Sequence, residues 1–578
     1  MSRNIIIALF LLVLPAISVA GTTVMNNYGN PDVLLFLIAV VGLVPIAISV
    51  TNLIPLRLYP LAIFSVSSAL VLHSALISQH LTGWDIQAEY YYYDLVVSTG
   101  HWTPTVAPVW SSSAAYQGAM SVTIFPAMTS LLTGVSGTLV FKVIFPMLYS
   151  MVPAVLFLTY RQMMGQKASF MAAFIFATVP WFSTQDLGLG KQMIAVSLLS
   201  VFLLALVSRI DRKYSLLLLL GLGVILAHYS TGLYFVVILA FLVPLSRIFG
   251  RRSLVSTRLV LTFSMFYLVW WAAVSSGFIV GYFTNSLIQL LSGLPNFFSL
   301  NSRYGVNIIL NSGLTLSDQV VKILNVSFQA LITLEVIALL YRRFRGTSIR
   351  PTWEFLALAL VNFGLLVVSV VVPYFSSEFN ISRLYSISLL FLAPFGVLGV
   401  KALLEPIKGF KVGLRSDTFW LRLVGIFALV FLLFNVGFVA AATNEPTQLA
   451  FAFTSSPSWP VYSQFEFSGG FWLVSHATSN TFVYSDMNSV PLFWSLGNIG
   501  QLDIPWPPRN STSITQPDDI VFLGPYNLKT GTIMLATTFA GGINDIETAF
   551  NLTQQLGTVI TSSDLVYNNG LSESFIYP

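Results

Sequence analysis

The sequence contains no cysteine and few charged residues. Of its 578 residues none is cysteine, 8% are Asp, Glu, Lys or Arg, and five are His. The missing cysteine excludes disulfide bonds, thiolate catalysis and Cys-ligated zinc. The low charge, with 56% hydrophobic and 14% aromatic residues, leaves too little polar surface for a soluble fold. The composition therefore predicts a polytopic membrane protein.

Long apolar runs are abundant in the chain. A helix needs about 20 predominantly apolar residues to cross a bilayer. Breaks at charged, Gly, Pro or Asn residues give thirteen candidate spans, at 4–20, 33–51, 58–79, 138–160, 168–183, 190–208, 215–230, 231–246, 259–282, 318–340, 355–376, 384–400 and 419–442. The first run follows Arg3, so a cleaved signal peptide is an alternative for it. We predict an all-α membrane domain over residues 1–444.

The segment 119–133 decides the topology. It is apolar, but it contains Pro126 and is bounded by Gly118 and Gly134, and we predict that it lies in or dips into the outer interface. With that choice, 20 of the 27 Lys and Arg residues fall on the cytoplasmic side, as the positive-inside rule requires. The N-terminus is then cytoplasmic and the C-terminal region extracellular. Because the bilayer accounts for the basic residues, the net charge of +5 indicates no nucleic-acid partner.

The first outer loop, 80–137, holds a dense group of acidic residues. Asp85, Glu89 and Asp94 flank four consecutive tyrosines, and Gly83-Trp84-Asp85 precedes a predicted helix. On that helix Asp85 and Glu89 share one face, whereas Asp94 lies about 140° away and is expected in solvent. Two carboxylates this close raise the pKa of one of them or bind a cation, so Mg²⁺ or Mn²⁺ is a candidate cofactor. The alternative is a capping Asp85 with a solvated Glu89.

Other ionisable residues gather in the remaining outer loops. Asp186 and Lys191 flank a short turn, His228 opens a tight hairpin between two spans, and Arg383 lies where a span enters from outside. Each has a structural alternative, such as Lys191 snorkelling from a helix end or His228 hydrogen-bonding within the hairpin. The long loop 283–317, which contains Arg303, either covers an outer site or lies on the surface.

Three short motifs carry a resemblance to a known family. Gly83-Trp84-Asp85-x-x-x-Glu89-Tyr90, Ala227-His228-Tyr229-Ser230-Thr231 and Val566-Tyr567-Asn568-Asn569-Gly570 resemble motifs of a family of large archaeal membrane proteins related to the GT-C-fold glycosyltransferases. The order of a span, an outer loop opening with an Asp motif, and a short Pro-containing apolar helix is similar to the start of that fold. GT-C enzymes take sugars from polyprenyl-phosphate carriers such as dolichyl phosphate.

The resemblance implies an inverting glycosyltransferase that acts at the outer face of the cell membrane. Asp85 occupies the position of the general base, which removes the proton of an acceptor hydroxyl; the acceptor is a glycan, lipid or protein of the cell surface. A carboxylate at the dry edge of a membrane is expected to have a raised pKa. We place the acceptor against Glu89, Asp186, His228 and Tyr229, any divalent cation between Asp85 and Glu89, and the donor phosphate against Lys191, Arg383 and Arg303.

Residues 445–578 change composition to Ser, Thr, Asn, Pro and Gly. The runs Thr481–Tyr484, Ile520–Leu523 and Ile533–Thr537 predict strands, and Asn544–Leu556 predicts a helix. We therefore expect a small extracellular α/β domain. Its sequons at Asn510 and Asn551 are candidate glycosylation sites.

Two other classes of function remain open on the sequence alone. The first is a non-enzymatic membrane anchor or assembly protein of the cell surface layer, which would use the outer domain. The second is a transporter, which would place ionisable groups near the middle of the membrane. His73 and Glu335 are the candidates for such groups inside spans.

Overall fold

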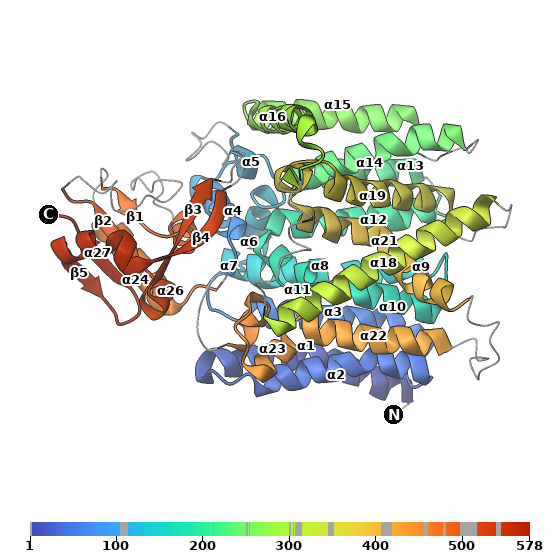
Figure 1. The fold of residues 1–578 in the computed structure, drawn as a ribbon, viewed down its shortest axis with the longest axis horizontal. Helices are drawn as coiled ribbons and strands as arrows, with labels where there is room; N and C mark the ends of the chain where they lie inside the picture. The colour runs from blue at the N-terminus through green and yellow to red at the C-terminus, as the bar shows by residue number, and fades with distance from the viewer. Residues whose placement is uncertain are drawn as a thin grey trace.

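The computed structural model describes residues 3–104, 114–211, 213–249, 253, 255–299, 302–303, 306, 315–344, 352–405, 419–454, 461–477, 481–496, 517–538 and 545–578. Among these residues, helices make up the first part of the chain and strands begin at Val483. In Figure 1 the long helices run side by side, and the strands lie beyond one end of them. The architecture is therefore an all-α membrane domain followed by a small α/β region, as predicted.

All thirteen predicted spans coincide with helices. Within the described ranges ten segments are long and apolar enough to cross a membrane, and the other three predicted spans coincide with the shorter helices α10, α13 and α22. The helices of the spans are α1 (Arg3–Tyr28), α2 (Asp32–Val50), η1 with α3 (Leu56–Ala75), α7 (Gly137–Leu139), η2 (Val140–Ile144), α8 (Phe145–Ser150), α9 (Val152–Tyr160), α10 (Gln166–Ala177), α12 (Gly190–Val207), α13 (Lys213–Ala227), α14 (Tyr229–Ile248), α15 (Thr257–Val274), α18 (Leu316–Phe344), α19 (Trp353–Val371), α21 (Ile381–Leu404) and α22 (Phe419–Asn435).

Shorter helices connect the spans. They are α4 (Asp85–Thr99), α5 (Ala114–Gln117), α6 (Ile124–Thr133), α11 (Pro180–Ser183), η3 (Gln185–Gly188), α16 (Phe278–Gly293), η4 (Leu294–Asn296), α20 (Phe375–Glu378), α23 (Phe438–Thr443) and η7 (Gln448–Phe453). At 1.5 Å per residue the ten residues of α6 rise about 15 Å, half of the hydrocarbon layer, so the predicted interfacial segment does not span. The loop predicted at 283–317 begins inside helix α16.

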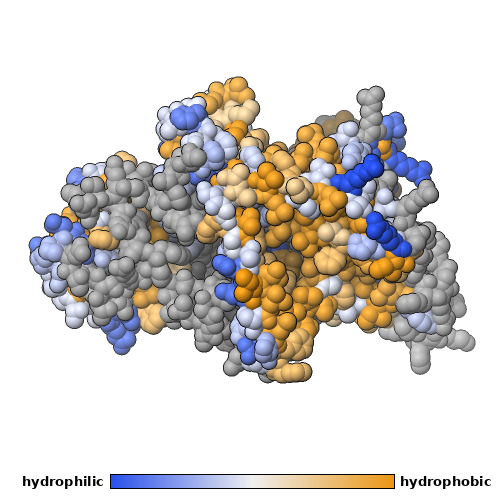
Figure 2. Space-filling view, turned by 90° about the horizontal axis from the view of Figure 1, so that it is seen from above, coloured by the Kyte–Doolittle hydropathy of each residue, from blue (hydrophilic) through white to orange (hydrophobic). Residues whose placement is uncertain are grey.

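The surface of the helical part is that of a protein embedded in a bilayer. Figure 2 shows an apolar band over the helices, with hydrophilic side chains beyond it. Large apolar side chains of the spans are exposed, among them Phe10 of α1, Leu219 of α13 and Leu261 of α15. The two ends of the chain lie at opposite ends of the helical bundle (Figure 1), which fits an odd number of spans. The chain is therefore a multi-pass membrane protein.

The C-terminal region contains two sheets. Strands β1 (Val483–Tyr484), β2 (Ile520–Leu523), β6 (Glu573–Ile576) and β5 (Asp564–Asn568) form the first in that order, with β1 and β2 parallel and the other pairs antiparallel. Strands β3 (Thr532–Thr538) and β4 (Asp545–Asn551) form an antiparallel pair. The helices here are α24 (Gln464–His476), α25 (Val490–Ser495), α26 (Pro525–Thr530) and α27 (Leu552–Ser562).

The helix predicted over Asn544–Leu556 is wrong in its first half. Asp545–Asn551 is strand β4, and only from Leu552 does the chain become helical, capped by the Asn551 side chain, which accepts a hydrogen bond from the Gln554 amide at 3.1 Å. Ile546, Thr548 and Phe550 recur at every second position, a spacing typical of a strand, and the acidic residues at 545 and 547 misled the helix prediction.

The predicted orientation can be tested by labelling single cysteines, because the chain has none of its own. We expect a membrane-impermeant maleimide to label Gln554→Cys, on the exposed surface of α27, in intact cells, and to label Gln166→Cys, at the start of α10, only after the membrane is opened. The reverse pattern would invert the assigned topology.

Candidate functional site

The first outer loop meets the turn before α12 through a contact between two glycines. Gly83 has φ +112°, and a Cβ at Gly83 would lie 2.4 Å from the Cα of Gly188. Glycine is needed here both for the backbone conformation and for the close approach. The contact brings Asp85, at the start of α4, next to the turn that carries Asp186 and Lys191.

Glu89 binds the N-terminus of helix α12. Its Oε2 accepts a hydrogen bond from the Gly190 amide at 2.7 Å, and its Oε1 accepts one from the Lys191 amide at 3.4 Å. A Cβ at Gly190 would lie 2.6 Å from Glu89 Oε2, so glycine makes room for this contact. A carboxylate suits a helix N-terminus, where free amides and the helix dipole favour negative charge.

The Lys191 ammonium lies between the two carboxylates of α4. Its Nζ is 2.8 Å from Asp85 Oδ2 and 2.9 Å from Glu89 Oε1, and it also lies 4.1 Å from the centre of the Tyr116 ring. Lys191 and Glu89 are fully buried, whereas 18% of the Asp85 side chain is exposed. Asp85 is thus the member of this group that solvent or a substrate can reach.

Helix α21 completes the cluster from the far side. Arg383, in its first turn and 30% exposed, places Nη2 3.8 Å from Asp85 Oδ2. One turn later Ser386 donates to Asp186 Oδ2 at 3.5 Å. Asp186 is buried and also accepts hydrogen bonds from Tyr149 (2.5 Å) and Gln192 (2.7 Å), so it ties α8, α12 and α21 together.

The turn between α13 and α14 adds His228 and Tyr229. His228 is fully buried; its Nδ1 lies 2.8 Å from Thr231 Oγ1, and its Nε2 has no hydrogen-bond partner among the described residues. Burial lowers the pKa of His228, and the charges of Lys191 and Arg383 lower it further, so the ring is neutral and faces the cations. Tyr229 packs at 4.9 Å against that ring.

The pKa of Asp85 departs from the sequence-based expectation. Burial raises this pKa, as expected, but Lys191 and Arg383 more than offset the effect, and the pKa lies below its ordinary value. Burial raises the pKa of Glu89, and it raises the pKa of Asp186 to about 6. The lowered pKa keeps Asp85 ionised at neutral pH.

The structure brings most of the predicted site residues together. Asp85, Glu89, Asp186, Lys191, His228, Tyr229 and Arg383 converge from α4, η3, α12, the start of α14 and α21. Glu89 and Asp186 have their oxygens occupied by protein donors, which favours positioning over the acceptor binding predicted for them. Asn510 lies outside the described residues, and Asn551 is exposed at the start of α27.

Arg303 is not part of this cluster. Its guanidinium donates to the Phe297 carbonyl and stacks at 5.0 Å on the Phe297 ring, and no ion pair joins it to Asp85 in the part of the chain that the structure describes. The prediction that Arg303 binds a phosphate beside Lys191 and Arg383 therefore finds no support, because its loop after η4 holds the side chain locally.

The carboxylates of the cluster do not fit a resident metal ion. The Lys191 ammonium occupies the space between Asp85 and Glu89 that a divalent cation would need. No group of three or more metal-type ligands occurs among the described residues. An ammonium in this position supplies the positive charge, and it also offers hydrogen-bond donors.

The C-terminal region holds the loop that leads to Asp85. The His80 ring stacks at 3.9 Å on Phe467 of α24, and Trp84 packs at 6.0 Å against Trp494 of α25. Asn569, in the third of the short motifs, donates to the Phe465 carbonyl of α24 at 2.7 Å. The motif near the C-terminus is thus linked through α24 to the loop that precedes Asp85.

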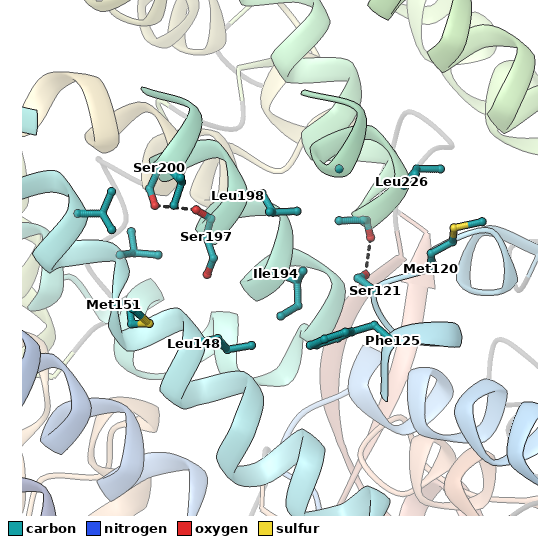
Figure 3. Close-up of a pocket in the computed structure, with 15 residues that line it drawn as sticks. Met120, Ser121, Phe125, Leu148, Met151, Ile194, Ser197, Leu198, Ser200 and Leu226 are labelled. Carbon is teal, nitrogen blue, oxygen red and sulfur yellow. Dashed lines mark hydrogen bonds between the residues drawn. The ribbon is translucent and has the colours of Figure 1, made fainter. Parts of the chain in front are cut away.

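An apolar cavity of about 430 Å³ begins one helical turn from Lys191. Figure 3 shows Ile194 and Ser197 of α12 on one side of it, with Met151, Phe125 and Leu226 around them. Ala227, the neighbour of His228, also lines it. Since Met151 and Phe125 belong to the exposed apolar surface, the cavity is open toward the lipid.

A larger cavity of about 860 Å³ lies between α18, α19 and α21. Ser382 and Tyr385 of α21, next to Arg383, line it together with polar residues of α18 such as Asn325 and Gln329. Two cavities of the helical bundle thus have lining residues close in the chain to members of the cluster, and one is almost entirely apolar whereas the other is mixed.

Several residues of the cluster carry no signal in the sequence. Tyr116 and Tyr149 have no charged residue beside them in the sequence, and Gln192 and Ser386 are uncharged polar residues on span helices. Only their contacts with Lys191 and Asp186 identify them. The one clue in the sequence is that Gln192 and Ser386 lie near span ends that the predicted topology places on the outer side.

Comparisons with known proteins give one family and a distant structural likeness. The family model described as "Predicted membrane protein (DUF2206)" matches residues 213–577. Solved structures of arabinofuranosyltransferase AftD from Mycobacteria, and of a mutant of it, share 13% and 14% identity, with TM-scores of 0.43 and 0.44 over 90% of this chain. The chain spans 40% and 41% of the length of those proteins. No curated protein matches the chain.

The glycine contact can be tested with a matched pair of substitutions. Gly83→Ala should unfold at a clearly lower temperature than Gly100→Ala, because both glycines have positive φ but only Gly83 lies against another backbone. We expect about 1 kcal/mol of destabilisation for Gly100→Ala and at least about 2 kcal/mol more for Gly83→Ala. Equal unfolding temperatures for the two purified variants would show that the contact is not made.

Proposed function

We propose that this chain, which belongs to the DUF2206 family of predicted membrane proteins, is a GT-C-type glycosyltransferase that moves a sugar from a polyprenyl-phosphate carrier to an acceptor at the outer face of the membrane. The observation that carries the proposal is the cluster of Asp85, Lys191 and Arg383, in which one accessible carboxylate lies beside two cations. The resemblance of the Gly83-Trp84-Asp85 motif to the GT-C enzymes supports the same assignment.

The charges of the cluster suit a transfer from a sugar phosphate. A carboxylate that is ionised at neutral pH can accept the proton of an acceptor hydroxyl, and cations can stabilise the charge that develops on a departing phosphate. Both kinds of group lie within 4 Å of each other, at the end of the bundle next to the C-terminal region. The transfer needs a base for the acceptor hydroxyl and cations for the phosphate that leaves the anomeric carbon, and the cluster offers both.

In the proposed reaction the acceptor oxygen attacks the anomeric carbon of the sugar. Its proton passes to an oxygen of Asp85 as the new glycosidic bond forms. The bond between the anomeric carbon and the phosphate oxygen breaks, and its electron pair leaves on the lipid phosphate, which Arg383 and Lys191 bind. A single displacement of this kind inverts the configuration at the anomeric carbon.

Binding of the donor phosphate would also change the pKa of Asp85, because Asp85 is paired with Lys191 and Arg383. Without substrate, Lys191 and Arg383 hold the pKa of Asp85 below its ordinary value, which makes Asp85 a weak base. A donor phosphate that binds to the two cations neutralises their charge, and burial then raises the pKa of Asp85. The base therefore becomes effective when the donor is in place.

The cavity of Figure 3 suits the apolar chain of the carrier. It begins one turn from Lys191, its lining is almost entirely apolar, and it opens to the lipid between Phe125 and Met151. A polyprenyl chain lying there would place its phosphate at the start of α12. His228, whose Nε2 has no partner among the described residues, and Tyr229 would then contact the sugar or the acceptor.

Removing the base tests the reaction. In membranes supplied with a panel of polyprenyl-phosphate sugars, Asp85→Asn should lower the rate of transfer by at least about 100-fold, the usual size of general-base catalysis. Asp94→Asn is the control, because Asp94 lies exposed on the same helix and should keep full activity. Transfer by Asp85→Asn at the wild-type rate would remove Asp85 from the proposed mechanism.

Filling the apolar cavity tests the position of the carrier. Ser197→Trp places a large side chain among the residues of Figure 3 and should raise the KM for the lipid donor about tenfold or more with a smaller change in kcat. Leu219→Trp, on the exposed face of the neighbouring helix α13, should leave both constants unchanged. Equal KM values for the two variants would place the chain elsewhere.

A further inference from the structure

A charged cavity of about 750 Å³ lies at the end of the bundle away from the Asp85 cluster. Helix α21 connects the two places: Arg383 is in its first turn beside Asp85, and Lys401, near its end, lines the cavity. At 1.5 Å per residue the 24 residues of α21 span about 36 Å. The cavity, which we call the inner cavity, is therefore separate from the proposed active site.

A buried carboxylate fixes one cation at the wall of the inner cavity. Glu335 is 2% exposed, inside the span of α18, and both of its oxygens bind Arg342 two turns later, at 3.2 and 3.4 Å. An arginine near the end of a span ordinarily extends toward water. Here Glu335 directs the guanidinium back along the helix, and Glu405 Oε2 lies 3.7 Å from the guanidinium Nη2.

Two lysines at the inner cavity lack such a partner. Lys401 and Lys167 both line it, and neither forms an ion pair with a carboxylate in the described part of the chain. Lys167 donates to the Thr51 carbonyl, at 3.2 Å. The described residues of the lining thus include three cations and two carboxylates, a net charge of +3 − 2 = +1.

The rest of the lining is apolar and aromatic. Phe355, Phe395, Leu398 and Trp420 contribute to it, and the cavity reaches between the ends of α10, α18, α21 and α22. A small hydrated anion would leave these side chains without contacts. A ligand that carries an anion on an apolar chain would satisfy both parts of the lining.

We propose that the inner cavity binds the headgroup of an anionic phospholipid. One phosphodiester carries a single negative charge, which matches the net charge of the lining, and its oxygens accept hydrogen bonds from Arg342, Lys401 and Lys167. The start of the acyl chains lies against Trp420 and Phe395. Basic cavities between membrane helices commonly hold such lipids.

The experiment measures lipid binding to the purified full-length protein in a neutral detergent. Short-chain phosphatidylglycerol, short-chain phosphatidylcholine and inorganic phosphate are titrated separately, and the thermal unfolding temperature is followed. Phosphatidylglycerol should raise this temperature, and its apparent affinity should fall about tenfold or more in the double variant Lys167→Gln/Lys401→Gln.

The control is a second double variant, Arg209→Gln/Arg258→Gln. It removes the same number of charges from exposed positions that do not line the cavity, and it should bind as the wild type does. An equal loss of phosphatidylglycerol affinity in the two double variants would overturn the proposal. An equal rise of the unfolding temperature with phosphatidylcholine and phosphatidylglycerol would also overturn it. A shift of the same size with inorganic phosphate alone would show a site for a free anion and would overturn it as well.

Discussion

The arrangement of the bundle end next to the C-terminal region depends on one buried ammonium. Lys191 has no exposed surface and lies within 3 Å of both Asp85 and Glu89, so each charge in the group requires the others. An unpaired charge at such a depth costs several kcal/mol, and breaking a buried pair typically costs about 3–5 kcal/mol. Loops far apart in the sequence must therefore meet for the chain to fold at this end.

Several other contacts position Lys191 between Asp85 and Glu89. Gly83 and Gly188 allow two backbones to touch, and Glu89 binds the start of α12 and thereby sets the direction in which Lys191 leaves the helix. Asp186 joins α8, α12 and α21, which places Arg383 next to Asp85. The C-terminal region contacts the loop before Asp85 through Phe467 and Trp494.

The charged residues at the two ends of the bundle have different neighbours. At the end next to the C-terminal region, Lys191 and Arg383 face an accessible carboxylate. Ile194 of α12 and Ser382 of α21, which are close to these cations in the chain, line two cavities. At the other end, Glu335 holds Arg342 near Lys167 and Lys401, which form no ion pair with a carboxylate among the described residues. Glu335, a candidate for a transport pathway on the sequence alone, thus has a local partner near the end of its helix.

Much of the fold could be predicted from the sequence because membrane spans are local patterns. Apolar runs bounded by charges, Gly or Pro locate the helices. Helix α6 is too short to span, because it starts only at Ile124 and ends before Gly134, which has φ +73°. Strand β4 was mistaken for a helix, since its acidic residues imitate a helix start and its partner β3 is a separate segment of the chain.

The residues of the cluster could be predicted, but not their partners. A charge in an apolar chain is conspicuous, which identified Asp85, Asp186, Lys191 and Arg383. Which charge neutralises which depends on packing between distant segments: Lys191 was expected to bind a phosphate, and in the structure it pairs with Asp85 and lowers the pKa that was expected to rise. Arg303 has the same chemistry and a similar location in the sequence, yet its loop keeps it at Phe297.

The central claim is that a donor phosphate replaces Asp85 as the partner of Lys191 and Arg383. The most direct measurement is a structure of the full-length protein with a polyprenyl monophosphate bound. We predict phosphate density within hydrogen-bond distance of Lys191 Nζ and the Arg383 guanidinium, with the Asp85 carboxylate moved off Lys191 and open to an acceptor. Phosphate density away from both cations, with the 2.8 Å contact between Lys191 and Asp85 unchanged, would contradict the claim.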